Sequence, residues 1–148
     1  MAKLTDLRNR FEAAVTANAY IQTFISGPMA DSERMLKRGY PALVLEIPFD
    51  SVISNYKKDP FERHTVNFFV IDEKLVKENE EDVWQKLTNM KDYGYDVIDY
   101  VISKATRPAY YDLVGDVRMR QAADPLRPGT VGVWFTLDIS VNDCRNES

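Results

Sequence analysis

The chain contains one histidine, His64, and one cysteine, Cys144, and neither lies in a sequence pattern typical of catalysis. A histidine base needs a nucleophile and an orienting partner within hydrogen-bond reach, and no G-x-S-x-G motif supplies a serine. A reactive thiolate needs a nearby positive charge or a helix start, and Arg145 is the only local candidate. We therefore interpret His64 as an ordinary strand-end residue and Cys144 as a structural or incidental thiol.

Five carboxylates gather around the start of a predicted helix: Asp72, Glu73, Glu80, Glu81 and Asp82. The helix dipole stabilises negative side chains at this position, and the EF-hand spacing is absent. A zinc site built only from cysteine and histidine is excluded, because the chain has one of each. The phosphate-binding motifs G-x-x-x-x-G-K-[ST] and G-x-G-x-x-G are also absent. We expect no catalytic residue, no metal site and no cofactor, and we predict that the chain is not an enzyme.

The composition is that of a globular domain. The 148 residues are 45% hydrophobic, which is enough for a core in one domain spanning residues 1–148. A net charge of −4 argues against a nucleic-acid-binding face, which is usually basic. The first residues have no apolar core of signal-peptide type, and no apolar run approaches the ~20 residues needed to cross a bilayer. We therefore expect no contact with a membrane.

Apolar spacing predicts two helices and five strands. The helices are expected at about residues 4–18 and 80–104, and the strands at 20–26, 42–47, 64–72, 116–121 and 131–141. One further helical turn is expected at 32–37. This order predicts an α+β fold, in which an N-terminal helix and one long helix cover one face of a mostly antiparallel sheet. Asn79 is expected to cap the long helix. Gly94 is expected to allow close packing of this helix against a strand, with a kink as the alternative.

The clearest alternation of apolar and polar residues lies in the last predicted strand. One face carries Val131, Val133, Phe135, Leu137, Ile139 and Val141, and the other carries Gly132, Trp134, Thr136, Asp138 and Ser140. A period of two residues predicts a strand with one buried face. We expect this strand to form a C-terminal hairpin with residues 116–121.

Three long loops are expected, at about residues 27–40, 49–63 and 122–130. Aromatic residues and arginine are common anchors of protein interfaces, and several lie in or beside these loops. The candidate subunit-interface residues are Phe49, Tyr56, Phe61, Tyr110, Tyr111, Arg127 and Trp134.

The order of elements and several short motifs resemble a family of viral proteins. The motifs are Gly27, Tyr40-Pro41, Trp84, Met90 and the run from Gly132 to Cys144. They are similar to the tail-terminator and tail-completion proteins at the neck of tailed bacteriophages. The likeness is greatest to the ring proteins of phages of Bacteroides-type hosts, including crAss-like phages. The segment 49–63 has no clear equivalent in that family.

The resemblance implies a virion structural subunit that assembles in the host cytoplasm. It would form a sixfold or twelvefold homo-oligomeric ring that contacts neighbouring portal, neck or tail proteins. Genomic DNA would pass through the ring without specific binding. Two alternatives remain open from the sequence. One is a small intracellular domain that binds a ligand or protein between the long helix and the sheet, and the other is an enzyme that uses His64 and a carboxylate.

Overall fold

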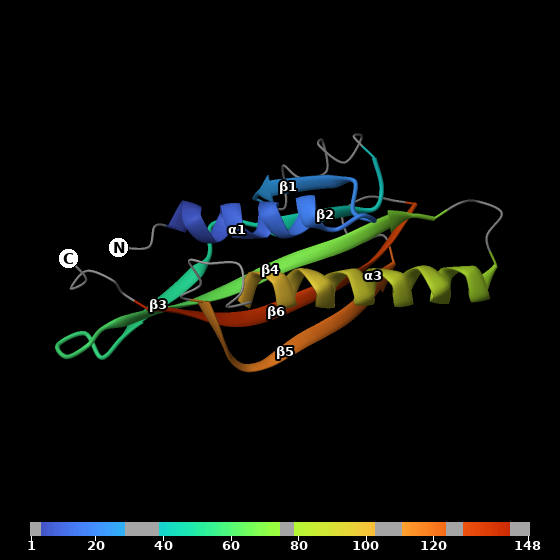
Figure 1. Ribbon diagram of the computed structural model, residues 1–148. Helices are drawn as coiled ribbons and strands as arrows, with labels where there is room; N and C mark the ends of the chain where they lie inside the picture. The colour runs from blue at the N-terminus through green and yellow to red at the C-terminus, as the bar shows by residue number, and fades with distance from the viewer. Residues whose placement is uncertain (1–3, 29–38, 75–78, 103–110, 124–128, 143–148) are drawn as a thin grey trace.

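A computed structural model describes residues 4–28, 39–74, 79–102, 111–123 and 129–142 (Figure 1). The described residues form two helices and six strands, and the predicted α+β fold is confirmed. In chain order the elements are α1 (Leu4–Ala17), β1 (Thr23–Gly27), β2 (Ala42–Glu46), β3 (Asp50–Ser54), β4 (Phe61–Glu73), α3 (Glu80–Ile102), β5 (Tyr111–Ala123) and β6 (Thr130–Asn142).

The strands form one sheet in the order β1-β2-β4-β6-β5, and β3 pairs with the first part of β4. Only β1 and β2 run parallel, and the other neighbours are antiparallel. Strands β4 and β6 pair along their whole length, from Phe61 opposite Asn142 to Glu73 opposite Thr130. The predicted pairings of residues 42–47 with 64–72, and of 116–121 with the last strand, are confirmed.

The two faces of the sheet have different surroundings. Both helices lie on one face, the helix face, and no described helix covers the other, which we term the open face (Figure 1). The main core lies on the helix face and contains five of the six apolar residues predicted for the inner side of β6. The sixth, Val131, is also buried. A smaller apolar cluster of Ile25, Ala42, Val44, Phe69 and Ile71 lies on the open face. Because side chains alternate along each strand, the sheet has an apolar layer on each face, and the layer on the helix face is the larger.

An aromatic column joins both helices to the sheet. The rings of Phe135 in β6 and Phe68 in β4 are stacked, with centroids 4.9 Å apart, and the Phe11 ring of α1 lies 5.5 Å from Phe68. Helix α3 reaches this column at Gly94, where an added Cβ would overlap Cε2 and Cζ of Phe135. The predicted close packing at Gly94 is thus confirmed, and the absence of a side chain there sets the distance between α3 and the sheet.

Polar contacts fix both ends of α3. Asn79 is the predicted cap: its Oδ1 accepts from the Asp82 backbone N–H at 2.9 Å, and Asp82 Oδ2 accepts from the Asn79 N–H at 3.3 Å. The last turn of α3 has no basic residue of its own. Arg10 of α1 donates instead to the carbonyl oxygens of Tyr100 and Val101, at 3.1 and 3.0 Å. A cation at this end opposes the helix dipole and satisfies carbonyls that the helix leaves unpaired.

The predicted loop at 49–63 is wrong, because most of it belongs to the sheet. Strand β3 pairs with the first part of β4, from Asp50 opposite Thr65 to Ser54 opposite Phe61. Strands β2 and β3 thus lie end to end along β4. Between the pairs Leu45–Phe68 and Asp50–Thr65 there are four residues, 46–49, on one side and two, 66 and 67, on β4. This irregularity changes the course of the chain without ending the pairing, and the result is one long hairpin.

Several predicted boundaries differ from the observed ones. Strand β1 begins at Thr23 instead of residue 20, and β5 begins at Tyr111 instead of residue 116. The predicted loop 122–130 is shorter, because β5 continues to Ala123 and β6 begins at Thr130. The helical turn predicted at 32–37 lies outside the described residues, as does most of the predicted loop 27–40.

Replacing Gly94 with alanine tests the close approach of α3. Alanine favours a helix by about 1 kcal/mol, but its methyl group would overlap the buried and stacked Phe135 ring. We expect Gly94→Ala to lower the free energy of unfolding by roughly 1–3 kcal/mol, measured by chemical denaturation. In a Phe135→Leu background the same change should cost much less, and an equal cost in both backgrounds would contradict the packing described.

Candidate functional site

His64 lies in a polar cluster between β3 and β4. It is the fourth residue of β4 and is buried, with 3% of its surface exposed, so its assignment as a strand-end residue is wrong. Its Nδ1 is 2.5 Å from Ser51 Oγ, across the β3–β4 pair, and its Nε2 is 3.1 Å from Glu62 Oε2. The Phe49 ring lies 6.1 Å from the imidazole. Sequence reasoning missed Ser51 and Glu62, although Glu62 and His64 are two residues apart and share a strand face.

The Ser51–His64–Glu62 cluster suits two roles. A hydroxyl, an imidazole and a carboxylate in a chain of hydrogen bonds form the arrangement that activates a serine nucleophile. The same contacts also give the buried imidazole its hydrogen-bond partners, and they connect Ser51 of β3 to His64 of β4. Ser51 is exposed and His64 is buried, so the cluster runs from the surface of the hairpin toward its interior.

The candidate interface residues occupy different environments. Tyr111 is buried in the main core with 7% of its surface exposed, so its prediction as a surface residue is wrong. Phe49 and Phe61 are half-buried, and Phe49 packs against the main core. Tyr56 is 72% exposed. The remaining candidates are Tyr110 and Arg127, which lie outside the described residues, and Trp134, which is half-buried on the open face.

The β3–β4 hairpin extends beyond both helices (Figure 1). Val52 and Ile53 of β3 are 51% and 53% exposed, and Tyr56 lies in the turn. Asn55 and Asp59 have positive φ angles of 54° and 51°, a backbone conformation that these residue types adopt more readily than most. The hairpin therefore presents apolar side chains to solvent on a paired and well-defined backbone.

The open face carries two buried polar atoms without a described partner. Trp134 packs against Phe69 with ring centroids 4.5 Å apart, and Tyr40 borders the same apolar cluster. Neither the Trp134 Nε1–H nor the Tyr40 hydroxyl finds a hydrogen-bond partner within the described ranges. Farther along the strands this face becomes polar, with hydrogen bonds of 2.7 Å from Thr136 to Asn67 and from Thr65 to Asp138.

A shallow groove on the open face contains two arginines. It is lined by Arg118, Met119, Arg120, Trp134 and Thr136, and we term it the arginine groove. Arg118 lies opposite Thr136 and Arg120 opposite Trp134, after a bulge between Val114 and Arg118. Both arginines are exposed, and neither forms an ion pair within the part of the chain that the structure describes. Arginine, tryptophan and methionine are enriched at the centres of protein interfaces.

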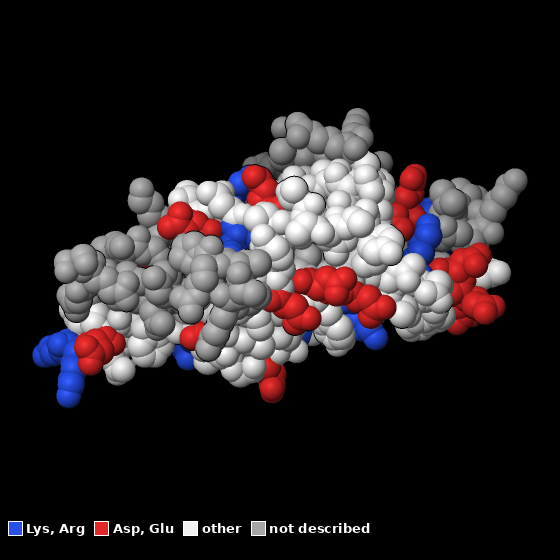
Figure 2. All heavy atoms as spheres, viewed as in Figure 1, with Lys and Arg blue, Asp and Glu red and all other residues white. Residues whose placement is uncertain are grey.

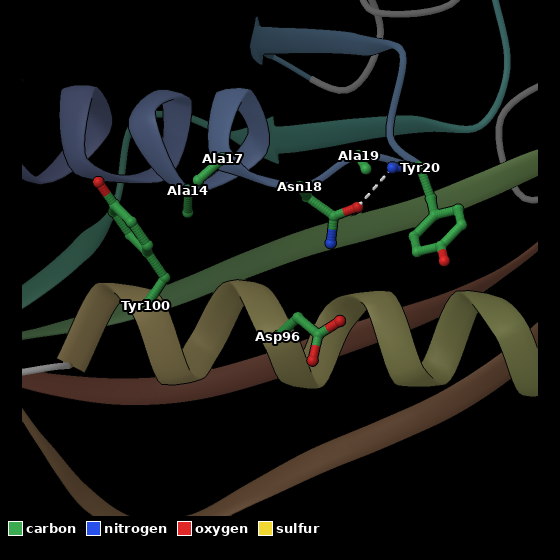
Figure 3. Close-up of a pocket in the computed structure, with 7 residues that line it drawn as sticks. All are labelled: Ala14, Ala17, Asn18, Ala19, Tyr20, Asp96 and Tyr100. Atoms are coloured by element: carbon green, nitrogen blue, oxygen red, sulfur yellow. Dashed lines mark hydrogen bonds between the residues drawn. The ribbon is translucent and has the colours of Figure 1, made fainter.

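The helix face carries a second groove, between α1 and α3 (Figure 3). Its lining consists of Ala14, Ala17, Asn18, Ala19, Tyr20, Asp96 and Tyr100, and its volume is about 230 Å³. Asp96 of α3 lines this groove, and its side chain lies over the surface of α3 (Figure 3). Acidic side chains form a row over α3 in the surface view (Figure 2), where Asp92, Asp96 and Asp99 are exposed. We term the groove between α1 and α3, together with the exposed Asp92, Asp96 and Asp99, the acidic groove.

Two tyrosines on the helix face have altered acidity. Burial raises the pKa of the Tyr111 hydroxyl, and the charge of Asp6 raises it further, while Arg10 has a smaller opposing effect. Burial also raises the pKa of Tyr93, together with the charges of Tyr20, Asp72 and Asp92. Both shifts favour the neutral hydroxyl in the folded protein.

The described residues contain neither a metal-binding cluster nor a membrane-spanning helix. Across residues 4–28, 39–74, 79–102, 111–123 and 129–142, no three carboxylate, histidine or cysteine side chains are grouped to hold a metal ion. The helices of these ranges are too short or too polar to span a bilayer.

Comparison of the chain with protein-family models and with curated proteins found no match.

Replacing Tyr111 with phenylalanine tests the buried hydroxyl. A folded-state pKa raised above the usual value of about 10 contributes stability that is complete below pH 10 and lost as the pH rises through the folded value. We expect Tyr111→Phe to reduce the loss of unfolding free energy between pH 9 and pH 11, measured by denaturant titration. The matched change Tyr56→Phe, at an exposed tyrosine, should leave that loss unchanged; an equal effect of both would contradict the assignment.

Proposed function

We propose that this protein is a structural subunit that assembles into a homo-oligomeric ring. The observation that carries the proposal is the β3–β4 hairpin, which extends past the helices and exposes Val52, Ile53 and Tyr56 (Figure 1). Val52 and Ile53 are consecutive in β3, so each face of the hairpin exposes an apolar side chain. Burying such side chains against a second protein is favourable. A hairpin that reaches beyond its own core is suited to contact a neighbouring subunit.

The resemblance to tail-terminator and head-tail connector proteins suggests where such a ring belongs. On this proposal the ring is part of the neck or tail of a tailed bacteriophage, assembles in the host cytoplasm and contacts portal, neck or tail proteins. Genomic DNA passes through it without specific binding. The net charge of −4 is in keeping with this, because affinity for phosphates grows with the number of lysine and arginine contacts.

Native mass measurement of the purified protein tests the ring. With a chain of 17.1 kDa we expect a discrete assembly of about 103 kDa for six copies, or about 205 kDa for twelve. Electron microscopy of the same sample should show closed rings. A protein that stays monomeric at high concentration, and that is missing from purified phage particles of the parent virus, would contradict the proposal.

The Ser51–His64–Glu62 cluster favours one alternative, a serine hydrolase. If the cluster only holds the hairpin together, the wild-type protein should hydrolyse an activated ester such as p-nitrophenyl acetate no faster than His64→Ala does. A wild-type rate that falls at least tenfold in both His64→Ala and Ser51→Ala would support the hydrolase instead. Circular dichroism of both variants establishes whether they remain folded, so that a lost rate reports chemistry and not unfolding.

A further inference from the structure

The two grooves are complementary in charge and lie on opposite faces of the sheet. The acidic groove is on the helix face, where Asp92, Asp96 and Asp99 are exposed. The arginine groove is on the open face and contains Arg118 and Arg120. None of these five charged residues forms an ion pair within the described ranges. Among the described residues, the charges of each groove are thus not neutralised by an ion pair, and the two grooves carry opposite signs.

The spacing of the charges also matches. Asp92 and Asp96 are one helical turn apart, which places them about 6 Å apart along α3. Arg118 and Arg120 are two residues apart in β5 and point to the same face, which separates them by about 6.8 Å. Two guanidinium groups on a strand can thus meet two carboxylates on a helix at the same time. Charge-assisted hydrogen bonds of this kind are stronger than neutral ones.

Aromatic residues lie beside the charges on both surfaces. Tyr20 and Tyr95 on the helix face are 61% and 45% exposed, and the Tyr20 ring stacks on Tyr93 at 5.0 Å. The arginine groove contributes Trp134, whereas Met119 lies opposite Phe135 and its side chain points to the helix face. The alanines of the acidic groove leave space beside Asp96 for a long side chain (Figure 3). Tyrosine and tryptophan paired with arginine are the residue types that contribute most to binding at protein interfaces.

We propose that the acidic groove of one copy of this chain binds the arginine groove of the next, so that successive subunits contact each other front to back. The partner is a second copy because one chain supplies both complementary surfaces. Since the surfaces lie on opposite faces, the contact is heterologous, and repeating it generates a closed ring or an open filament. This inference rests on the proposed ring and specifies the contact that builds it.

Charge reversal on each surface tests the contact. The variant Arg118→Glu/Arg120→Glu should fail to assemble with itself, because carboxylates would meet carboxylates. The variant Asp92→Lys/Asp96→Lys should fail for the opposite reason. We expect each reversal to raise the dissociation constant between subunits by at least about 100-fold, as like charges placed together in an interface are costly. The single change Asp96→Lys has a matched control in Glu81→Lys, which makes the same charge change near the start of α3.

Mixing the two reversed variants gives the sharper result. The unchanged acidic groove of the arginine variant can bind the unchanged arginine groove of the aspartate variant, and the two altered surfaces can bind each other. Neither variant can bind a second copy of itself, so the two variants must alternate around the ring. The mixture should therefore form rings with the two variants in equal numbers, resolved by native mass spectrometry from their different masses. A chain that carries all four changes should assemble alone.

The outcomes separate this contact from the ring itself. A monomeric wild-type protein would remove both proposals. A wild-type ring that survives both reversals, or a mixture that forms no equal-number rings, would remove the contact and leave the ring. If the arginine variant forms normal rings but loses a gel shift with duplex DNA that the wild type shows, the arginine groove is a phosphate site and the inference is wrong.

Discussion

The fold depends on the column of Phe11, Phe68 and Phe135, because both helices and the two central strands meet there. The rings of β4 and β6 stack face to face, Phe11 attaches α1 to them, and Gly94 lets α3 lie directly on Phe135. Once α3 is fixed against the sheet at this point, the Arg10 contacts to its last carbonyls set the position of α1 along it. The gap between the helices, and with it the acidic groove, follows from these two constraints.

The sequence predicted the structure best where an element is determined by residues close to one another in the chain. The alternation through Phe135 identified the buried face of β6 because a half-buried strand must place every second residue in the core. Asn79 could be identified as a cap because capping depends on residues within one helical turn. The two central strands and the long helix were predictable for this reason.

Features that depend on distant partners were not predictable from local pattern. Strand β3 has four exposed residues and no apolar alternation, and it is a strand because β4 supplies its hydrogen bonds. With β3 interpreted as a loop, Ser51 could not be placed beside His64. Tyr111 was taken as an interface candidate because the strand was expected to begin only at residue 116. Gly115 has a φ of +71° in the β5 bulge, so the strand continues through it and Tyr111 reaches the core.

The β5 bulge has a consequence for the sign of the charge on the open face. Three residues, 115–117, lie between the pairs Val114–Asp138 and Arg118–Thr136, where β6 has only Leu137. In an unbroken ladder from Val114, Asp116 would lie opposite Thr136 and Arg118 opposite Trp134, so that an acid and a base would neutralise each other in the groove. The two additional residues move the acid out and bring a second arginine in. The electrostatic character of this surface is thus encoded in strand register. A slip of the ladder that closed the bulge and kept every residue would bring Asp116 opposite Thr136, with no change in sequence.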